Sequence, residues 1–256
     1  MSKKNGLFGF VLYIFFFSCL MLLIPACNVI FPPKILNLTV YPRSEGYLAM
    51  INVSEAKPAL LIQDTELKNF DQFLADLKTE GNDPQILILG TLNAGMMEKI
   101  KSSGVLDTIK EFHFPEMNER PAYLESAVKE LKAKKVLTGP LRQSRYLPLR
   151  HAELIVLAPH EYDVYDEKSR IAFKLIRGRK SIILAPMIDN PLYKTLTRSF
   201  GKGALRSDVV FGVGISGVAE NLVNELFNHP EIILTDIMEP KVPVRFRTDG
   251  NMLERL

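Results

Sequence analysis

The stretch Ile86-Leu-Ile-Leu-Gly-Thr-Leu-Asn-Ala-Gly-Met-Met-Glu-Lys-Ile100 decides the fold class that we expect for this chain. Its first four residues are an apolar run that predicts a buried strand, and residues 94–101 predict a helix. Gly90 to Ala94 supply the turn between them. In α/β folds, the turn between a strand and the next helix is a usual place for chemistry. This turn has no histidine, cysteine or carboxylate, so we expect the architecture of an active site without its reactive groups.

The composition is that of an ordinary globular protein, with 47% apolar and 24% charged residues. Residues 34–256 are balanced in charge, because Lys3 and Lys4 account for two of the 32 basic residues and leave 30 against 29 acidic ones. A domain with this charge balance does not attract nucleic acid strongly. It also lacks cysteine, and its isolated histidines (His113, His151, His160 and His229) show no metal-ligand spacing.

Residues 1–33 are predicted to target the chain to a membrane. Leu7 to Ala26 is an uncharged run of 20 residues, about the length that a helix needs to cross a hydrocarbon core of roughly 30 Å. Ile24-Pro-Ala-Cys27 resembles a bacterial lipoprotein box, in which Cys27 would carry lipid. A lipoprotein and an uncleaved single-pass anchor both remain open. Either one contacts the membrane through residues 7–27 and places the body on the extracytoplasmic side.

Residues 34–256 form the second predicted unit, which comes after the stiff linker Pro32-Pro33. Each half of this unit opens β-rich and then alternates strands with helices. We expect strands at 35–41, 47–53, 58–63, 85–89, 108–114, 135–138, 152–157, 170–176, 181–184, 208–212, 231–235 and 242–247, and helices at 66–79, 94–101, 122–132, 191–200 and 217–227. This order fits two β-sheets packed face to face with helices outside.

These stretches resemble the metallo-β-lactamase fold, and in particular the C-terminal soluble domain of ComEC-type competence DNA-uptake proteins. Members of that family open with a hairpin reading roughly Asp-Val-Gly-Gln-Gly-Asp, followed by an apolar strand and Leu-Ile-Asp-Thr-Gly. The matching segments are 42–47 and 60–66, in which Gly46, Asp64 and Thr65 keep the pattern. The resemblance implies an α/β fold, a four-layer αββα sandwich, over residues 35–256.

The resemblance also locates the family's metal ligands, and each of these positions is replaced. The family motif Thr-His-x-His-x-Asp-His overlies residues 89–97, its bridging aspartate overlies Met187, and its later pair of histidines overlies 214–215. The framework segments 152–159, 166–178 and 247–250 match as well. The degenerate pocket, defined by these positions and one neighbour, consists of Thr91, Asn93, Gly95, Met96, Met187, Gly214, Ile215 and Ser216.

The replacements remove the donors that a zinc site requires. Zinc binds imidazole, thiolate and carboxylate groups, whereas the thioether of methionine is soft and neutral, and glycine and isoleucine offer no donor. Without the metal, nothing lowers the pKa of a bound water. We therefore expect no cofactor, no metal and no catalytic residue. The resemblance then implies a non-catalytic binding or structural module at the cell envelope, with an unknown envelope protein as partner and a possible link to DNA uptake.

A rival signal supports a different function. Gly212-Val-Gly-Ile-Ser-Gly217 is a literal G-x-G-x-x-G between a predicted strand and a helix, and Asp236 comes about 20 residues later. The alternative function is therefore an enzyme, with either a reorganised hydrolytic site or a nucleotide in the Gly212–Gly217 loop. Only 20 residues come after Asp236, which is too few for the remaining units of a dinucleotide-binding fold.

A basic loop is the remaining candidate site. Arg142, Arg145 and Arg150 lie around Tyr146, and arginines interleaved with an aromatic residue suit single-stranded nucleic acid. A solvated loop is the plainer interpretation of the same residues. Phosphate binding by these three arginines would be weak and would fall steeply with salt.

Overall fold

The computed structural model describes residues 34–43, 46–158, 171–185, 187–201, 205–212, 214–234 and 243–256. The expected membrane segment with Cys27, the start of the framework segment 166–178, His160 and Asp236 lie outside these residues. The chain divides into two compact units, Met1–Lys34 and Ile35–Leu256, and the elements described here belong to the second. No helix of the described residues has the length and apolar character to cross a membrane.

The first sheet contains eight strands, and the half that ends at β6 is parallel. Strands β3 to β6 pair in parallel, while β15, β1 and β2 pair antiparallel with their neighbours. The spatial order is β16 (Leu253–Arg255), β15 (Val244–Thr248), β1 (Leu36–Pro42), β2 (Tyr47–Val53), β3 (Ala59–Ile62), β4 (Ile86–Leu89), β5 (Glu111–Pro115) and β6 (Leu137–Leu141).

The second sheet contains six strands, and two short strands form a separate pair. Its order is β14 (Glu231–Leu234), β12 (Val209–Gly212), β10 (Lys180–Leu184), β9 (Ala172–Arg177), β8 (Glu153–Ala158) and β7 (Tyr146–Pro148). The separate pair is β11 (Ile188–Asp189) with β13 (Ile215–Ser216), in parallel.

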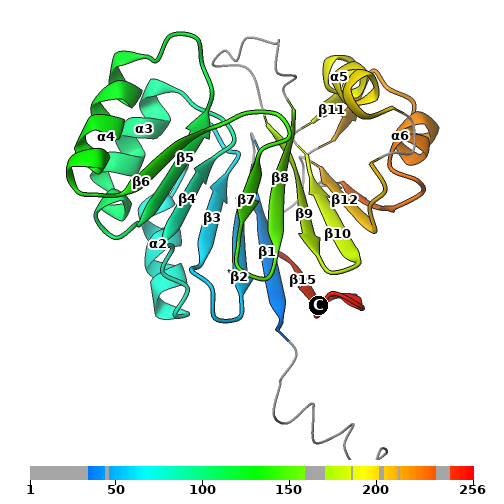
Figure 1. Cartoon of the computed structure of the whole chain (residues 1–256), viewed down its shortest axis with the longest axis horizontal. Coiled ribbons are helices and arrows are strands. Elements are labelled where there is room, and N and C mark those ends of the chain that lie inside the picture. The colour runs from blue at the N-terminus through cyan, green and yellow to red at the C-terminus, as the bar shows by residue number, and fades with distance from the viewer. Residues whose placement is uncertain are drawn as a thin grey trace, which may run out of the picture. The chain divides into compact units, whose positions relative to one another are not determined.

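The helices lie outside the two sheets (Figure 1). Three of them cover the first sheet: α2 (Phe70–Thr79), α3 (Ala94–Ser102) and α4 (Ala122–Ala133). The other two, α5 (Asn190–Phe200) and α6 (Glu220–Leu226), cover the second. The described residues of the second unit therefore form two sheets face to face with helices on both outer sides, as the sequence predicts.

Burial along the strands explains this layering. In β1, Leu36, Leu38 and Val40 are fully buried and alternate with more exposed residues, since this strand buries one face. All four residues of β4 are buried, because a central parallel strand is covered on both faces. Side chains of both sheets share one hydrophobic cluster, and a second cluster joins the outer face of the second sheet to α5 and α6.

Several elements differ from the prediction, either in their boundaries or because the prediction lacks them. Helix α2 begins at Phe70 rather than Glu66, because Leu67 and Asn69 have φ angles of 46° and 54° that a right-handed helix excludes. The basic loop contains strand β7, and the short strands β11, β13 and β16 are absent from the prediction. Strand β5 starts at Glu111 instead of Thr108, because a 3₁₀ turn at Val105–Asp107 precedes it.

Candidate functional site

The residues at the carboxyl ends of β3 and β4 form hydrogen bonds with the start of a strand of the second sheet. Gly90, which comes after β4, accepts a hydrogen bond from the backbone N–H of Ile171 over 2.9 Å. Gln63, which comes after β3, donates from its side-chain amide to the backbone oxygen of Ile171. Ile171 comes directly before β9, so one residue of the second sheet bonds to two strand ends of the first. We call this junction of Gln63, Gly90 and Ile171 the closed edge.

Two glycines permit the close approach at the closed edge. A Cβ on Gly46 would lie 1.7 Å from the backbone oxygen of Gln63, and a Cβ on Gly90 would lie 2.3 Å from the Nε2 atom of Gln63. The position at Gly90 is also 3.0 Å from the ring of Phe173. Side chains at either position would occupy space that Gln63 already fills, so both glycines are required by packing.

Buried polar atoms gather around the same strand ends. Tyr47 is paired with Gln63 through a backbone hydrogen bond of 2.9 Å, and its ring packs edge-on against Phe211 of the second sheet at 5.7 Å. Within the described residues, the Tyr47 hydroxyl, Gln63 Oε1 and Thr91 Oγ1 have no hydrogen-bond partner. Burial raises the pKa of Tyr47 well above its usual value, which keeps its hydroxyl neutral. The closed edge is neutral and largely shielded from water.

The first half of the degenerate pocket, from Thr91 to Met96, leads into helix α3 and forms its first turn. Asn93 accepts a hydrogen bond from the backbone N–H of Met96 over 2.7 Å, which makes it the N-cap of α3. Its side-chain amide donates to the backbone oxygen of Thr65 over 3.2 Å. Met96 is fully buried, whereas Gly95 is exposed in the first turn. Both polar atoms of Asn93 are therefore occupied by backbone groups.

The second half of the pocket is brought together by the short parallel pair β11–β13. Ile188 pairs with Ile215 and Asp189 with Ser216, and the backbone N–H of Ile188 donates to the oxygen of Gly214 over 2.8 Å. The Cε atom of Met187 lies 4.0 Å from the position that a Cβ on Gly214 would take. Backbone pairing thus positions the pocket residues Met187, Gly214, Ile215 and Ser216, whose side chains offer apolar groups, a thioether and one hydroxyl.

The carboxylates of Asp64 and Asp189 also accept hydrogen bonds from nearby backbone groups. Asp64 is 2% exposed and accepts from the backbone N–H of Glu66 over 3.1 Å, and its burial raises its pKa. Asp189 caps helix α5 by accepting from Leu192 N–H over 2.9 Å. Each carboxylate thus has a local structural role at a turn or a helix start.

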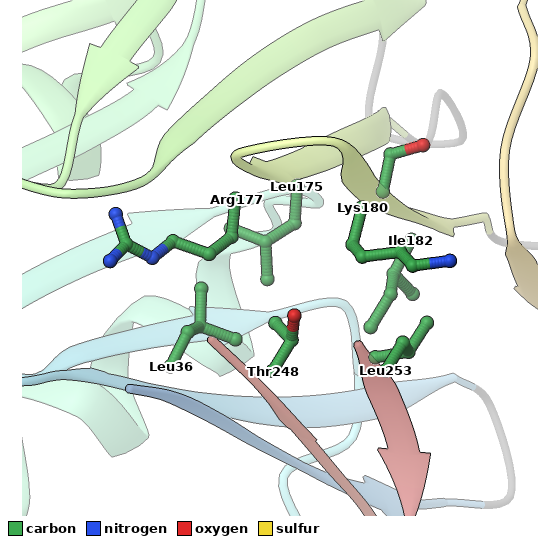
Figure 2. A pocket seen from close by; sticks show the side chains of 8 residues that line it. Leu36, Leu175, Arg177, Lys180, Ile182, Thr248 and Leu253 are labelled. Carbon is green, nitrogen blue, oxygen red and sulfur yellow. The ribbon is translucent and has the colours of Figure 1, made fainter. Parts of the chain in front are cut away.

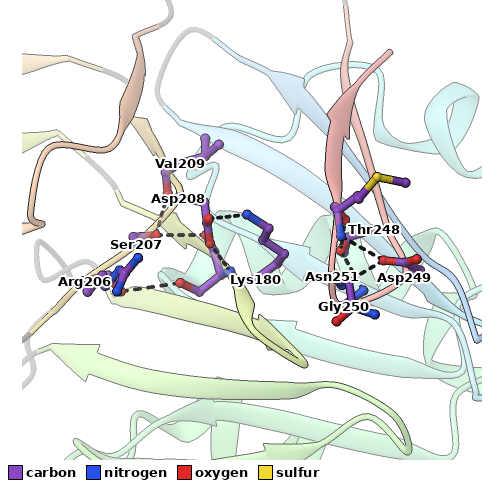
Figure 3. Close-up of polar contacts among 11 residues, drawn as sticks. Lys180, Arg206, Ser207, Asp208, Val209, Thr248, Asp249, Gly250 and Asn251 are labelled. Carbon is purple, nitrogen blue, oxygen red and sulfur yellow. Dashed lines mark hydrogen bonds and ion pairs between the residues drawn. The ribbon is translucent and has the colours of Figure 1, made fainter.

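Asp208 lies at the other end of the second sheet, before β12. It forms an ion pair of 2.9 Å with Lys180 and accepts from the backbone N–H of Ser181 over 2.8 Å (Figure 3). Between the sheets, near Lys180, a cavity of about 10 Å³ is lined by Leu36, Leu175 and Thr248 among others (Figure 2). That volume is about the size of one water molecule, so the cavity is no substrate site.

The residues at the positions that the sequence resemblance assigns to metal ligands do not fit a pair of zinc ions. They present a hydroxyl, a carboxamide with both atoms bonded, two thioethers and side chains without donors, whereas zinc requires imidazole, thiolate or carboxylate. No group of three His, Cys, Asp or Glu side chains able to hold a metal occurs among the residues that the structure describes. The misfit arises from the donor chemistry at these positions.

The three arginines of the basic loop are spread over the first sheet. Arg142 lies 3.4 Å from Glu116, which comes after β5, while Arg150 lies 3.2 Å from Glu55, which precedes β3. Since β3 and β5 run parallel, these two ion pairs lie toward opposite ends of the sheet. Arg145 covers Gly139 of β6 and donates to the backbone oxygen of Pro140. Each guanidinium already contacts an acceptor of this chain.

The glycine-rich loop does not run directly into a helix. Its residues 215–216 form strand β13, and helix α6 starts only at Glu220 after the N-cap Ala219. A carboxylate in the first turn opposes a bound phosphate, and α6 has only seven residues. Gly217 has a φ of 68° and a Cβ there would lie 2.9 Å from the side-chain nitrogen of Asn190. Glycine is therefore favoured at position 217 both by this close contact and by its left-handed backbone.

Sequence patterns predict no role for Gln63 or Tyr47, although the structure places both at the closed edge. The signal for Gln63 is a polar residue directly after the four apolar residues of β3. Tyr47 carries no signal of its own, because an aromatic residue at a strand start is also typical of a core position. Of the histidines, His113 is 4% exposed on β5, and His229 lies in a turn with a φ of 56°.

Comparison with known proteins yields similar structures but no similar sequence. No protein-family model and no curated protein matches the chain. Similar solved structures include CmlA, a diiron β-hydroxylase from Streptomyces venezuelae (15% identity, TM-score 0.46), and the metallo-β-lactamase-fold protein YhfI from Bacillus subtilis (10% identity, TM-score 0.46). A long form RNase Z from yeast is another, with 8% identity and a TM-score of 0.45.

The extent of these matches differs. The chain spans only 38% of CmlA and 33% of the yeast RNase Z, but 99% of YhfI, and the matches cover 78%, 72% and 83% of this chain. Solved proteins of the metallo-β-lactamase fold are thus similar in structure to this chain. With TM-scores below 0.5, the activities of those proteins are not transferred to it, and its function has to be inferred from its own side chains.

Proposed function

We propose that this protein is a non-catalytic binding module, carried at the membrane surface by its N-terminal segment. The observation that supports the proposal is the chemistry of the closed edge and the degenerate pocket. Gln63 bonds a backbone oxygen through its amide nitrogen, Asn93 and Asp189 accept from backbone N–H groups, and Met96 is buried in the core. A hydrolytic site needs a group that activates water. The amides of Gln63 and Asn93 and the thioether of Met96 are not bases, and the carboxylate of Asp189 caps helix α5.

The proposed partner is a protein of the cell envelope rather than nucleic acid. Arg142 and Arg150 each form an ion pair with a glutamate, and Arg145 is partly buried over β6. Phosphate binding would have to break these contacts, and the charge-balanced body offers little long-range attraction. The proposed link to DNA uptake rests on the family resemblance of the sequence alone.

The test is the metal content and hydrolytic activity of the full-length chain purified in a mild detergent. We expect far less than one zinc, manganese or iron per chain by elemental analysis, and no hydrolysis of a phosphodiester or a β-lactam. The midpoint of thermal unfolding should not move with a chelator, because no metal binding is linked to folding.

A matched variant identifies the source of any metal or activity that is found. The double substitution Thr91→Val and Met187→Leu removes a hydroxyl and a thioether from the degenerate pocket with little change in volume. If the wild type held a full equivalent of metal and hydrolysed a phosphodiester, and this variant lost both, the pocket would be catalytic and the proposal would be wrong. Equal traces in both proteins would come from contaminants and would support the proposal.

Membrane attachment is tested separately at Cys27. Cells are labelled with a fatty-acid analogue and express either the wild type or Cys27→Ala. Labelling of the wild type alone, together with a smaller mature protein, would support the lipoprotein form. Equal labelling and unchanged size in a protein that stays in the membrane fraction would support a single-pass anchor. A protein released in soluble form in both cases would contradict attachment.

A further inference from the structure

A groove of about 330 Å³ runs along helix α2 on the outer side of the first sheet. Its walls are one face of α2, the end of β1 and the start of β15, and its main side chains are Tyr41, Arg43, Phe73, Asp76, Glu80 and Arg245. This volume lies at the lower end of the range for small-ligand sites, which is roughly 300–1,000 Å³. The groove belongs to neither the closed edge nor the degenerate pocket. We call it the α2 groove.

The floor of the α2 groove is aromatic. Tyr41 and Phe73 pack edge to face with their ring centroids 4.9 Å apart and their planes at 78°. The guanidinium carbon of Arg43 lies 5.3 Å from the centre of the Phe73 ring, within the range of a cation–π contact. These contacts form an aromatic floor and place a cation over Phe73, in the first half of α2.

Charges of both signs surround this floor. Burial and the carboxylate of Glu80 raise the pKa of Tyr41, while Arg245 and Arg43 oppose that rise. The Tyr41 hydroxyl therefore lies within electrostatic reach of groups on α2, β15 and the residue after β1. Burial raises the pKa of Asp64 as well, and Arg43 opposes that rise.

The charges are not evenly distributed along the groove. Asn69 and Gln72 lie at the start of α2 and Arg43 lies over the ring of Phe73 in its first half, whereas Asp76 and Glu80 lie toward its end. Gln72 donates to Asp76 over 2.8 Å, which leaves the second carboxylate oxygen of Asp76 for another donor. The helix dipole has the same sense, positive at the start and negative at the end. Arg245 lies across from Thr39 on the neighbouring strand and reduces this polarity in part.

The length of the groove sets the size of a matching ligand. Asn69 and Glu80 are separated by eleven residues of mostly helical chain, or roughly 16 Å at about 1.5 Å per residue. An extended peptide advances about 3.3 Å per residue, so four or five residues would span that distance. An aromatic floor with a guanidinium at one end and carboxylates at the other complements such a peptide with both termini charged.

We propose that the α2 groove binds a short extended peptide with its terminal carboxylate at Arg43 and its terminal ammonium group at Asp76 and Glu80. This inference goes beyond the proposed function, because it names a ligand and a site outside the degenerate pocket. It does not depend on whether that pocket binds metal. A failure of one proposal therefore leaves the other standing, and the two experiments measure different quantities.

The test is calorimetric titration of the full-length chain in detergent with four forms of one tetrapeptide, Ala-Ala-Phe-Ala. The forms have both termini free, the C-terminus amidated, the N-terminus acetylated, or both modified. We expect the free form to bind, and each single modification to weaken binding at least about tenfold, which corresponds to 1.4 kcal/mol. Arg43→Met should abolish the difference between acid and amide, while Glu80→Gln should reduce the difference between amine and acetylated amine.

Controls separate binding in the groove from a change in folding. Arg142→Met makes the same substitution outside the groove and should leave all four affinities unchanged. If Arg43→Met failed to fold, the effect of acetylation in Glu80→Gln would still test the opposite end. Absence of binding by the free peptide, equal affinities for all four forms, or loss of discrimination in Arg142→Met would each overturn the proposal.

Discussion

The closed edge lies at the ends of β3 and β4, whereas the α2 groove lies at the end of β1 and the start of β15 of the same sheet. The two sites use polar residues in opposite ways. At the closed edge, Gln63 bonds a backbone oxygen of the other sheet, and its neighbours Tyr47 and Thr91 are buried and uncharged. In the groove, Arg43 and Glu80 are charged and border open space. A neutral amide can be buried if it is bonded, whereas a charge is retained where water or a ligand can reach it. A structural junction thus lies beside an open, charged surface.

The largest effect should come from breaking the closed edge at Gly46. In Gly46→Ala, the new Cβ would lie 1.7 Å from the backbone oxygen of Gln63, so the β2–β3 pairing must shift. We expect a loss of about 3 kcal/mol or more in the free energy of unfolding, at the upper end for overpacking. Urea denaturation monitored by circular dichroism measures it.

Gly95→Ala is the matched control for this prediction. Its Cβ would lie 3.6 Å from Asn93 Oδ1, an ordinary contact in the first turn of α3. Alanine is favoured over glycine in helices, so the stability should be unchanged or rise by up to about 1 kcal/mol. Similar losses in both variants would mean that the strand ends are looser than the structure indicates.

The next effect concerns the bond between the sheets. Gln63→Leu keeps the bulk of the side chain but leaves the backbone oxygen of Ile171 without this donor, which should cost about 1–3 kcal/mol. Gln72→Leu removes an exposed amide that bonds Asp76 in the groove, and it should change stability by less than about 0.5 kcal/mol. Denaturation of both variants side by side measures the contrast, and equal losses would contradict the role given to Gln63.

A smaller effect depends on pH and arises at His113. Burial first, and then the nearby Arg145, lower the pKa of His113, while Glu111 opposes the shift. The unfolded chain therefore binds the proton more readily, and stability should fall as pH drops through about 6.5 toward the lower pKa of the folded state. The loss is about 1.4 kcal/mol for each unit between the two values.

Denaturation of the wild type and His113→Gln at pH 7.5 and pH 5.5 measures this loss. The difference between the two pH values should shrink in the variant. Asp64, whose pKa is also shifted, is present in both proteins, so its contribution cancels when they are compared. An unchanged difference in His113→Gln would assign the acid sensitivity to other groups.

The sequence predicts the layers of this fold better than its contacts. Apolar runs such as 86–89 show strands through local composition, and the alternation in 36–42 shows which face is buried. The predicted start of α2 is four residues too early. Leu67 fits the apolar periodicity of the helix, but its backbone and that of Asn69 are left-handed. Two-residue strands such as β11 carry too few residues for any periodic signal.

The candidate sites show the same limit. The polar turn at 91–93 is found from its place after a strand, but the cap formed by Asn93 depends on backbone geometry. The α2 groove joins residues 41–43, one face of α2 and residue 245, which are distant in sequence. Their charges are ordinary when each segment is considered alone, and it is the pairing of β1 with β15 that brings residue 245 close to residues 41–43.

The smallest expected effect tests whether the closed edge is dry. The hydroxyl of Tyr47 is fully buried and has no partner among the described residues, so its burial costs free energy that the ring must offset. Tyr47→Phe keeps the ring and its packing against Phe211, and it should change stability by between zero and a gain of about 1 kcal/mol.

Tyr41→Phe is the control in the groove, where a half-buried hydroxyl near solvent should contribute nothing measurable. A loss of more than about 1 kcal/mol in Tyr47→Phe alone would mean that the hydroxyl bonds an internal water. The closed edge would then be a wet site resembling a binding pocket, and the contrast with the α2 groove would fail.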